Sequence, residues 1–537
     1  MINRRQLLTT GVGVAAIGTG AAMLSGCTTT PPDDRSSGGS TAVLPRTSTT
    51  WPVSYDHPGS PDGIIAPFLY RYPSPPPVTS PTPPGDGSTI TAMCQLNTPA
   101  PTPMAQNPVW QAINTALNAT LDVQFTPGSG WAPKLQAILA GGNLPDILQI
   151  TATPKLPDLL SRTFADLTEH LSGDAVSAYP NLALLGEAAW RNVTFDGRIG
   201  GIPQPRNRAS GFPYRIRADV FESLGLDPKP TTGKELEDLM HQVTDPGAKR
   251  YASAGVPAAL TAFATMFGAP NKWEVRDGAL LSEYESEEYL SALDRVRTLW
   301  AQEVFHPESF STPNAVTLFD NAQSVIEYGS FDALPRHAQG IATDPTYRAG
   351  FMVAPRYEGG GPARARLDSG YYGMAALPKT ASPDRIRTLL KVLDWIAAPA
   401  GTAEFLLRQY GLEGRDHTID ADGILQQTPQ AGSEIVILGY LSCPRPVYVP
   451  PSPELRPDYD RFYEALVAQY QDPRDNAANG YYVEAPSAAA NWERRLADTA
   501  NEIIKGNQPT SAWTDIVATW RAEVGDQLRD LITTARG

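Results

Sequence analysis

The fold of this chain is decided by one stretch, Lys134-Leu135-Gln136-Ala137-Ile138-Leu139-Ala140-Gly141-Gly142-Asn143-Leu144-Pro145-Asp146-Ile147-Leu148-Gln149-Ile150. Its first half places apolar residues at the three- and four-residue steps of a helix, and the glycine pair ends that helix. After Pro145, residues 146–150 form the short apolar run of a buried strand. A helix that passes through a glycine stop into a buried strand predicts one unit of an alternating α/β layer.

The sequence on either side extends this pattern. Residues 90–96 predict a first strand, 109–117 a helix and 121–125 a second strand. Farther along, apolar stripes at helical spacing run through 384–397, 459–470 and 513–520. Aromatic residues at that spacing are expected to face a core rather than a ligand. We therefore predict an α/β fold with mixed, mostly parallel sheets flanked by helices.

Length and charge narrow the class of protein. A chain of 537 residues is too long for one compact core, so we expect at least two lobes. The formal net charge of −14 argues against nucleic-acid binding, which needs clustered cationic side chains. The same charge argues against broad electrostatic contact with anionic lipid.

The first 27 residues have the pattern of an export signal. Leu24-Ser25-Gly26-Cys27 resembles the bacterial lipobox, in which the cysteine is acylated and becomes the first mature residue. Arg4-Arg5 resembles the twin-arginine signal, although paired basic residues also open general secretory signals. We predict a lipoprotein signal peptide over 1–27 and a membrane anchor on Cys27. Residues 28–88 are rich in proline and predict an extended spacer, although the large apolar residues of 51–72 suggest that part of it lies against the folded body.

The landmarks, taken in order, resemble the family 1 extracellular solute-binding proteins of the maltose-binding-protein type, in particular their LipO-like lipoprotein branch. The resemblance covers roughly residues 89–530, and its motifs are the 134–147 stretch already quoted, Phe164-Ala165-Asp166-Leu167-Thr168, Asp196-Gly197-Arg198-Ile199-Gly200-Gly201-Ile202-Pro203, Phe267-Gly268-Ala269-Pro270-Asn271-Lys272-Trp273, Asp394-Trp395-Ile396 and Tyr410-Gly411-Leu412-Glu413-Gly414. The segment that follows the first predicted strand, with Pro99, Pro101 and Pro103, is longer than is usual in the family. The shape of the first binding loop therefore stays open.

This resemblance implies a two-lobe periplasmic-binding-protein-like fold of type II, with a ligand cleft between the lobes. We expect lobe 1 to contain 89–205 and 370–428, and lobe 2 to contain 206–369 and 429–537. It also implies a monomeric, extracellular protein that captures a mono- or oligosaccharide by hinge closure and delivers it to ABC permease subunits. A lipid anchor would be its only membrane attachment.

Sugar recognition needs aromatic faces for the C–H side of a ring and planar polar groups for its hydroxyls. We expect such residues after strands and at the crossings between lobes. The candidates are Asn97, Trp131, Arg206, Trp273, Tyr328, Phe331, Asp368, Tyr371, Tyr372, Glu413 and Trp492. For each aromatic residue, ordinary packing is the alternative interpretation.

The sequence offers no sign of catalysis. It contains no G-x-S-x-G, H-E-x-x-H or P-loop motif, and its six histidines show no metal-ligand spacing. We expect no enzymatic activity, no metal and no cofactor.

Several alternatives stay open at this point. The ligand is either a carbohydrate or, alternatively, a peptide, a polyamine or another small solute. A secreted carbohydrate-active enzyme needs two converging carboxylates, which spacing does not exclude. A sugar-sensing lipoprotein that serves a membrane kinase would have the same sequence pattern. Cys94 and Cys443 form either a disulfide or two free thiols.

Overall fold

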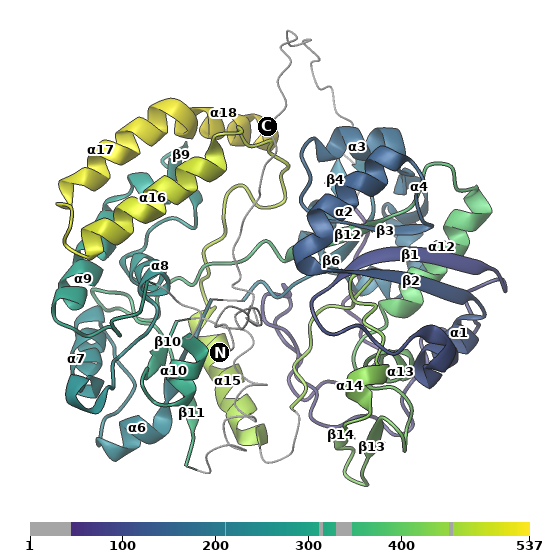
Figure 1. Cartoon of the computed structure of the whole chain (residues 1–537), viewed down its shortest axis with the longest axis horizontal. Helices are drawn as coiled ribbons and strands as arrows, with labels where there is room; N and C mark the ends of the chain where they lie inside the picture. The colour runs from purple at the N-terminus through teal and green to yellow at the C-terminus, as the bar shows by residue number, and fades with distance from the viewer. Residues whose placement is uncertain (1–43, 210, 311–314, 329–345, 451–454) are drawn as a thin grey trace, which may run out of the picture.

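The computed structural model describes residues 44–209, 211–310, 315–328, 346–450 and 455–537. The predicted signal peptide, the acylation site at Cys27 and the candidate Phe331 lie outside these residues. Figure 1 shows two bodies of helices and strands side by side, which we call lobe 1 and lobe 2. Each lobe has its own hydrophobic core.

Lobe 1 is built on a five-stranded sheet in the order β2-β1-β3-β12-β6. The quoted stretch folds as predicted, because Gly142 adopts a left-handed φ of 69° and its N–H closes the helix on the Ile138 carbonyl at 3.2 Å. The main elements of this lobe are β1 (Thr89–Leu96), α1 (Pro108–Leu117), β2 (Thr120–Pro127), α2 (Gly128–Gly141), β3 (Ile147–Ile150), α3 (Leu156–Thr163), α4 (Thr168–Leu171), α5 (Glu187–Arg191), β4 (Thr194–Phe195), β5 (Arg198–Ile199), β6 (Ile202–Pro205), β12 (Tyr371–Ala376) and α12 (Pro383–Ile396).

A smaller group of elements follows α12 and lies at one end of lobe 1 (Figure 1). It contains α13 (Ala403–Tyr410), β13 (His417–Ile419), β14 (Leu425–Gln427) and α14 (Ala431–Glu434). A small apolar cluster joins this group to the N-terminal part of the chain through Val53, Leu69 and Tyr72.

Lobe 2 contains a three-stranded sheet, β10-β7-β11, and most of the long helices. Its main elements are β7 (Tyr214–Arg217), α6 (Ala218–Ser223), α7 (Gly233–Val243), α8 (Val256–Phe267), β8 (Trp273–Arg276), β9 (Ala279–Ser282), α9 (Glu287–Ala301), α10 (Ala315–Asp320), β10 (Ile326–Glu327), β11 (Ala349–Met352), α15 (Arg456–Gln469), α16 (Ala489–Ile504), α17 (Ser511–Trp520) and α18 (Asp526–Arg536). The last three helices pack on α9 and on the β8-β9 hairpin, and the aromatic stripe of α17 enters the core as predicted.

The predicted α/β fold class is confirmed, but the expectation of mostly parallel sheets is correct only in part. Strands β1, β2 and β3 pair in parallel, whereas β12 runs antiparallel to both β3 and β6. The lobe 2 sheet is antiparallel at both of its described pairings. The reason is topological: β12 enters lobe 1 from lobe 2, so it lies in the sheet in the opposite direction to the strands joined by local helices.

The packing boundaries also differ from those expected. Ile64, Ile65 and Phe68, expected in a spacer, are buried in the lobe 2 core, so at least 64–72 belongs to the folded body. Residues 436–441, assigned from the sequence to lobe 2, pack in the lobe 1 core. Counted over the buried core residues that the structure describes, the chain therefore passes between the two cores four times, at 69–89, 203–208, 368–373 and 442–447.

Two further observations bear on the sequence predictions. Cys94 and Cys443 are both free thiols, so the disulfide alternative is not realised. In the described ranges, no helix combines the length and the apolar character that a bilayer crossing demands.

Candidate ligand-binding site

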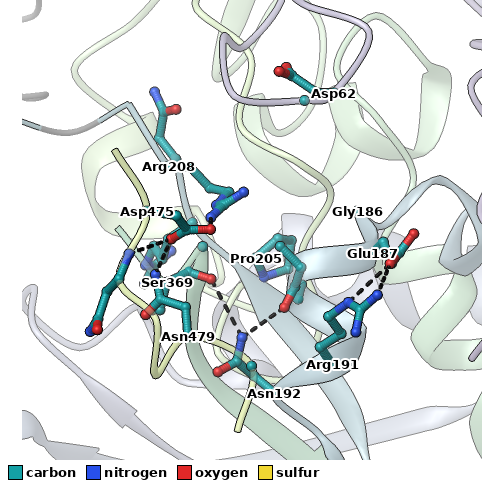
Figure 2. Close-up of a pocket in the computed structure, with 18 of the residues that line it drawn as sticks. Asp62, Gly186, Glu187, Arg191, Asn192, Pro205, Arg208, Ser369, Asp475 and Asn479 are labelled. Atoms are coloured by element: carbon teal, nitrogen blue, oxygen red, sulfur yellow. Dashed lines mark hydrogen bonds and ion pairs between the residues drawn. The ribbon is translucent and has the colours of Figure 1, made fainter. Parts of the chain in front are cut away.

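A cavity of about 750 Å³ lies between the lobes beside the crossings (Figure 2). Lobe 1 contributes four residues of α5 to its wall, and lobe 2 contributes Glu274, residues 475–477 and residues 479–481. The crossing residues Arg206, Arg208 and Gly370 also line it. A space of this size, bordered by two bodies, suits a small or oligomeric solute.

Two of the crossings run side by side and form the centre of the interlobe connection. The Arg206 N–H donates to the Gly370 carbonyl at 2.9 Å, and the Asp368 N–H donates to the Arg208 carbonyl at 2.9 Å. Gly370 has a φ of +73°, and a Cβ at this position would come within 2.9 Å of Arg208 Cγ. A glycine is therefore required where the two crossings approach each other.

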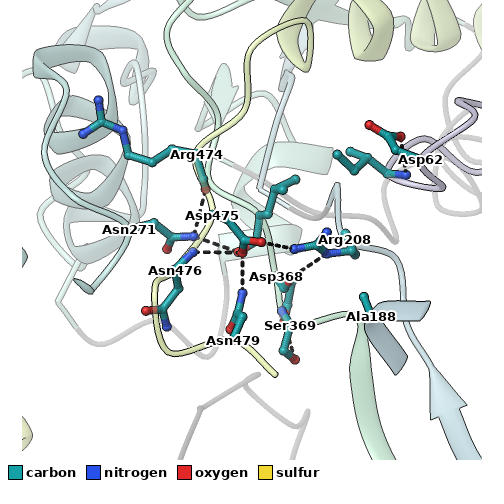
Figure 3. A network of polar contacts seen from close by, with 12 residues as sticks. Asp62, Ala188, Arg208, Asn271, Asp368, Ser369, Arg474, Asp475, Asn476 and Asn479 are labelled. Atoms are coloured by element: carbon teal, nitrogen blue, oxygen red, sulfur yellow. Dashed lines mark hydrogen bonds and ion pairs between the residues drawn. The ribbon is translucent and has the colours of Figure 1, made fainter. Parts of the chain in front are cut away.

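A polar network ties lobe 2 to the first crossing (Figure 3). Arg208 donates to Asp475 at 2.6 Å and to the Asp368 carbonyl at 3.2 Å. Asp475 also accepts from the Asn479 side chain at 2.6 Å. Because the Asp475 side chain is 48% exposed, we expect this ion pair to orient the chain rather than to add much stability.

Residues 471–484, which we call the bridging segment, contact both lobes. On the lobe 2 side, the Ala477 N–H donates to the Trp273 carbonyl at 2.8 Å. On the lobe 1 side, the Lys155 N–H donates to Glu484 at 2.9 Å and the Leu156 N–H donates to the Tyr482 hydroxyl at 3.2 Å. The segment therefore connects the two lobes, and six of its residues line the cavity.

An aromatic and polar group lies where β1 ends, at the lobe 1 side of the crossings; we call Tyr372, Tyr440, Arg206 and Asn97 the tyrosine cluster. The rings of Tyr372 and Tyr440 have centroids 5.9 Å apart. The Arg206 guanidinium lies 4.5 Å from the centre of the Tyr372 ring. Asn97 donates to the Tyr440 hydroxyl at 2.8 Å.

Buried amides hold this cluster in place from below. Gln149 accepts from the Gln95 N–H at 2.9 Å and donates to Gln204 at 3.3 Å. Gln204 donates in turn to the Tyr440 carbonyl, and the Gln95 side chain donates to the Tyr372 hydroxyl. Because Gln149 and Gln204 are fully buried, these bonds fix the positions of Tyr372 and Tyr440.

The alternation of the strand explains which tyrosine reaches the surface. Tyr372 is 37% exposed, whereas Tyr371 is half-buried and packs against the lobe 1 core. Burial raises the pKa of Tyr371 well above its ordinary value, as expected for a hydroxyl that faces the protein interior. The structure thus brings Asn97, Arg206 and Tyr372 together and places Tyr371 behind them.

A second, smaller cavity of about 450 Å³ lies on the lobe 2 face. Tyr328 and Asp368, both candidates from the sequence, line it together with Phe212, Lys272 and Arg366. It shares Ser369, Asn476 and Asn479 with the first cavity, so the two adjoin at the second crossing and the bridging segment.

Three tryptophan candidates are buried in the cores and line neither described cavity, so the structure does not bring them together with the other candidates as the sequence prediction expected. Trp131 is 2% exposed in the lobe 1 core, and Trp273 and Trp492 are 8% and 1% exposed in the lobe 2 core. Trp273 contacts Trp520, and Trp492 donates to Glu523 at 3.0 Å. Hydrophobic burial of these large rings outweighs any role at the surface.

Glu413 is also separated from the other candidates. It is exposed in the turn between α13 and β13 and lines neither of the two described cavities.

The sequence interpretation missed Tyr440, Arg208, Arg445 and Asp475. Tyr440 belongs to the tyrosine cluster and Arg445 lines the interlobe cavity, but both lie in a segment without helix or strand, where no periodicity indicates which side chains are accessible. Arg208 could have been found from the sequence, because it lies only three residues after Pro205, at the predicted crossing between the lobes. No group of three His, Cys, Asp or Glu side chains suited to a metal ion occurs in the part of the chain that the structure describes.

Two α/β lobes, joined by paired crossings and bordering a solute-sized cavity, define the class of two-lobe binding proteins. The sequence agrees: residues 102–403, more than half of the chain, match the family of bacterial extracellular solute-binding proteins, and the chain belongs to that family. This confirms the resemblance drawn from the sequence. Membership in a family of binding proteins also confirms the expectation that the chain is not an enzyme.

Individual relatives are distant. Lipoprotein LipO of Bacillus subtilis (strain 168) is 21% identical over 472 residues, which cover 83% of this chain and 91% of that protein. The polygalacturonan/rhamnogalacturonan-binding protein YtcQ of the same organism is 24% identical over 318 residues, which cover 56% of this chain and 62% of that protein. Among solved structures, the N-glycan transport solute binding protein NgtS of Streptococcus pneumoniae aligns with a TM-score of 0.60 at 12% identity, over 83% of this chain and 98% of that one, and so supports the fold alone.

Proposed function

We propose that this protein is a lipid-anchored receptor that captures a carbohydrate outside the cell and delivers it to an ABC importer. The observation that carries the proposal is the tyrosine cluster, whose Arg206 also lines the interlobe cavity. The exposed ring of Tyr372 and the half-buried ring of Tyr440 offer apolar faces to the C–H side of a sugar, and the amide of Asn97 and guanidinium of Arg206 offer planar donors to its hydroxyls. A peptide ligand would instead be expected to use exposed strand edges or an apolar groove.

The capture mechanism follows from the two lobes and their crossings. A solute held by the tyrosine cluster and by the lobe 2 wall would contact both lobes only when they approach each other. Its binding would therefore favour the closed form by the difference in its affinity for the two forms. No bond is made or broken, so the ligand reaches the importer unchanged.

The relatives also favour a sugar. YtcQ is named for the binding of polygalacturonan and rhamnogalacturonan, and NgtS for N-glycan transport. Neither name establishes the ligand of this chain, but both fit an aromatic and polar site better than they fit the recognition of a peptide or a polyamine.

The proposal is tested by titrating the purified soluble body, residues 44–537, in a calorimeter against a panel of oligosaccharides and a panel of peptides. We expect saturable binding to at least one oligosaccharide and no binding to peptides. Binding to peptides alone would refute the carbohydrate proposal.

The lipid anchor is a separate part of the proposal and rests on Leu24-Ser25-Gly26-Cys27. We expect the full-length protein expressed in its bacterial host to partition into detergent and Cys27→Ala to appear in the aqueous phase or the medium. Equal partitioning of both forms would argue against acylation at Cys27.

A further inference from the structure

The interlobe cavity is more basic than the protein around it. Its wall contains five arginines and four acids, namely Arg191, Arg206, Arg208, Arg445 and Arg536 against Asp62, Glu187, Glu274 and Asp475. The whole chain has the opposite balance, with 57 acidic and 43 basic side chains. A local excess of cations in an acidic protein needs an explanation at the site itself.

The four acids are already engaged within the protein. Glu187 pairs with Arg191 at 2.6 Å, and Asp475 pairs with Arg208 at 2.6 Å. Glu274 lies 3.1 Å from Arg276 and 3.2 Å from Arg474. Asp62 accepts from the Ile64 N–H at 3.0 Å and from the Ser60 hydroxyl.

Three of the five arginines have no such partner among the described residues, and one of them, Arg536, donates to the Ala477 carbonyl instead. Within the described residues, neither Arg206 nor Arg445 forms an ion pair with a carboxylate. Arg206 is exposed and lies over the Tyr372 ring, and Arg445 is half-buried over Trp51 at 5.4 Å. Both therefore keep donor capacity for a ligand on the cavity side.

The surroundings of Arg445 are shaped to receive its guanidinium group. A Cβ at Gly63 would lie only 2.1 Å from Arg445 Nη2, and Gly63 also has a φ of +72°. Burial lowers the pKa of Arg445, and the nearby Asp62 only partly offsets this effect. The cost of burying this cation is thus not fully compensated inside the protein, and an anionic ligand would compensate it.

We infer that the interlobe cavity selects carbohydrates that carry carboxylate groups, that is, uronic-acid oligosaccharides, with Arg206 and Arg445 as the groups that bind the carboxylates. This inference rests on the proposed carbohydrate function. A guanidinium group binds a carboxylate through two parallel hydrogen bonds, and Arg206 does so beside a ring that stacks on the same sugar. Neutral sugars of the same size would lack these contacts.

The test uses matched ligands that differ only in charge. Oligomers of galacturonate, mannuronate/guluronate and glucuronate are each compared by calorimetry with the carboxyl-reduced form of the same oligomer. We expect at least one acidic oligomer to bind about tenfold or more tightly than its reduced form, with an affinity that falls as sodium chloride rises. Equal or tighter binding of the reduced forms, or of neutral glycans only, overturns the inference while leaving the carbohydrate function intact. If no glycan of either kind binds, both proposals fail.

Variants then assign the effect to the two arginines. Arg206→Gln and Arg445→Gln should each reduce the preference for the acidic oligomer by about tenfold and leave the affinity for its reduced form nearly unchanged. The matched control is Arg348→Gln, which removes an exposed arginine paired with Glu222 on the surface of lobe 2. If Arg445→Gln lowers the melting temperature, Arg445→Lys preserves the charge without the planar fork and should keep part of the preference. An unchanged preference in both Arg206→Gln and a folded Arg445 variant overturns the assignment.

Discussion

Tyr372 shows how a single residue position separates binding from packing. Its ring is exposed above a buried row of amides, so removing it should leave the core intact. We expect Tyr372→Ala to weaken carbohydrate binding about tenfold or more while the melting temperature of the empty protein changes little. Calorimetry and thermal unfolding measure the two quantities.

Tyr372→Phe is the matched variant, because it keeps the ring and removes only the hydroxyl that accepts from Gln95. Affinity that is retained in Tyr372→Phe and lost in Tyr372→Ala would assign the contact to stacking. A large loss of stability in Tyr372→Ala would instead identify the ring as part of the core.

Trp273 is expected to behave in the opposite way. It is 8% exposed in the lobe 2 core and packs against Trp520. Trp273→Ala should lower the free energy of unfolding by about 3–5 kcal/mol, because a large ring leaves a cavity. Val275→Ala on the same strand, at 46% exposure, is the control and should change it by less than about 0.5 kcal/mol in urea unfolding. Comparable losses in the two variants would contradict the packing role of Trp273.

Asp394 predicts a pH dependence of stability. Its carboxylate accepts from the Asn181 and Leu182 N–H groups, but burial outweighs these bonds and raises its pKa to about 7. The folded protein then holds a proton that the unfolded chain, with a pKa of 3.8, releases, so stability should fall as pH rises from about 4 to 7.

At about 1.4 kcal/mol per pKa unit, the loss attributable to Asp394 amounts to a few kcal/mol. Asp394→Asn cannot ionise and should flatten the slope of unfolding free energy against pH in urea titrations at pH 5, 6, 7 and 8. Parallel slopes for the two proteins would show that Asp394 keeps an ordinary pKa.

For individual residues, the sequence predicted the candidate site only in part. Asn97, Arg206 and Tyr372 were predictable because each lies at a strand end or a crossing, where side chains face the interlobe space. The burial of the tryptophan candidates was not predictable, because tryptophan occurs both in hydrophobic cores and at sugar-binding surfaces. Only the packing in the folded protein distinguishes the two roles. Tyr440 and Arg445 had no local signal, because their segment has no regular period.

Among the larger elements, the bridging segment is the one whose role is most directly testable. Its lobe 1 end is held through Tyr482 and Glu484 to the N–H groups of Lys155 and Leu156. In the double variant Tyr482→Phe/Glu484→Ala, these two amides lose their acceptors and should exchange with solvent several-fold faster. Hydrogen-exchange mass spectrometry of peptides over 151–160 and 476–488 measures the effect.

Tyr481→Phe is the matched control, because its exposed ring lies in the same segment and keeps its position over Arg536. Exchange in this control should match that of the unmodified protein. Unchanged exchange in the double variant would mean that the bridging segment does not restrain lobe 1 in solution.

The elements themselves were predicted well where local chemistry determines them. The helix, glycine stop and strand of 134–150 became α2 and β3, because φ of +69° at Gly142 is a local requirement. Strand direction was predicted less well, since β12 pairs with β3 across more than two hundred residues of sequence. The direction of such a pairing depends on the path of the chain between the lobes. It produces no periodic pattern in the sequence from which it could be predicted.

At the scale of the whole molecule, ligand binding should change the distance between the lobes. The crossings at 203–208 and 368–373 are short, paired and free of helix, so they are the expected site of rotation. Small-angle scattering should show a smaller radius of gyration with the bound oligosaccharide than without it. An identical radius in both states, at saturating ligand, would contradict capture by closure.

The four passages of the chain between the two cores have a consequence for how this protein is made and cut. Neither lobe is a continuous piece of polypeptide, so a ribosome must complete at least residue 441 before the lobe 1 core has all of its parts. A single proteolytic nick in a surface loop would likewise leave two fragments interlocked by both cores, and only a denaturant would separate them.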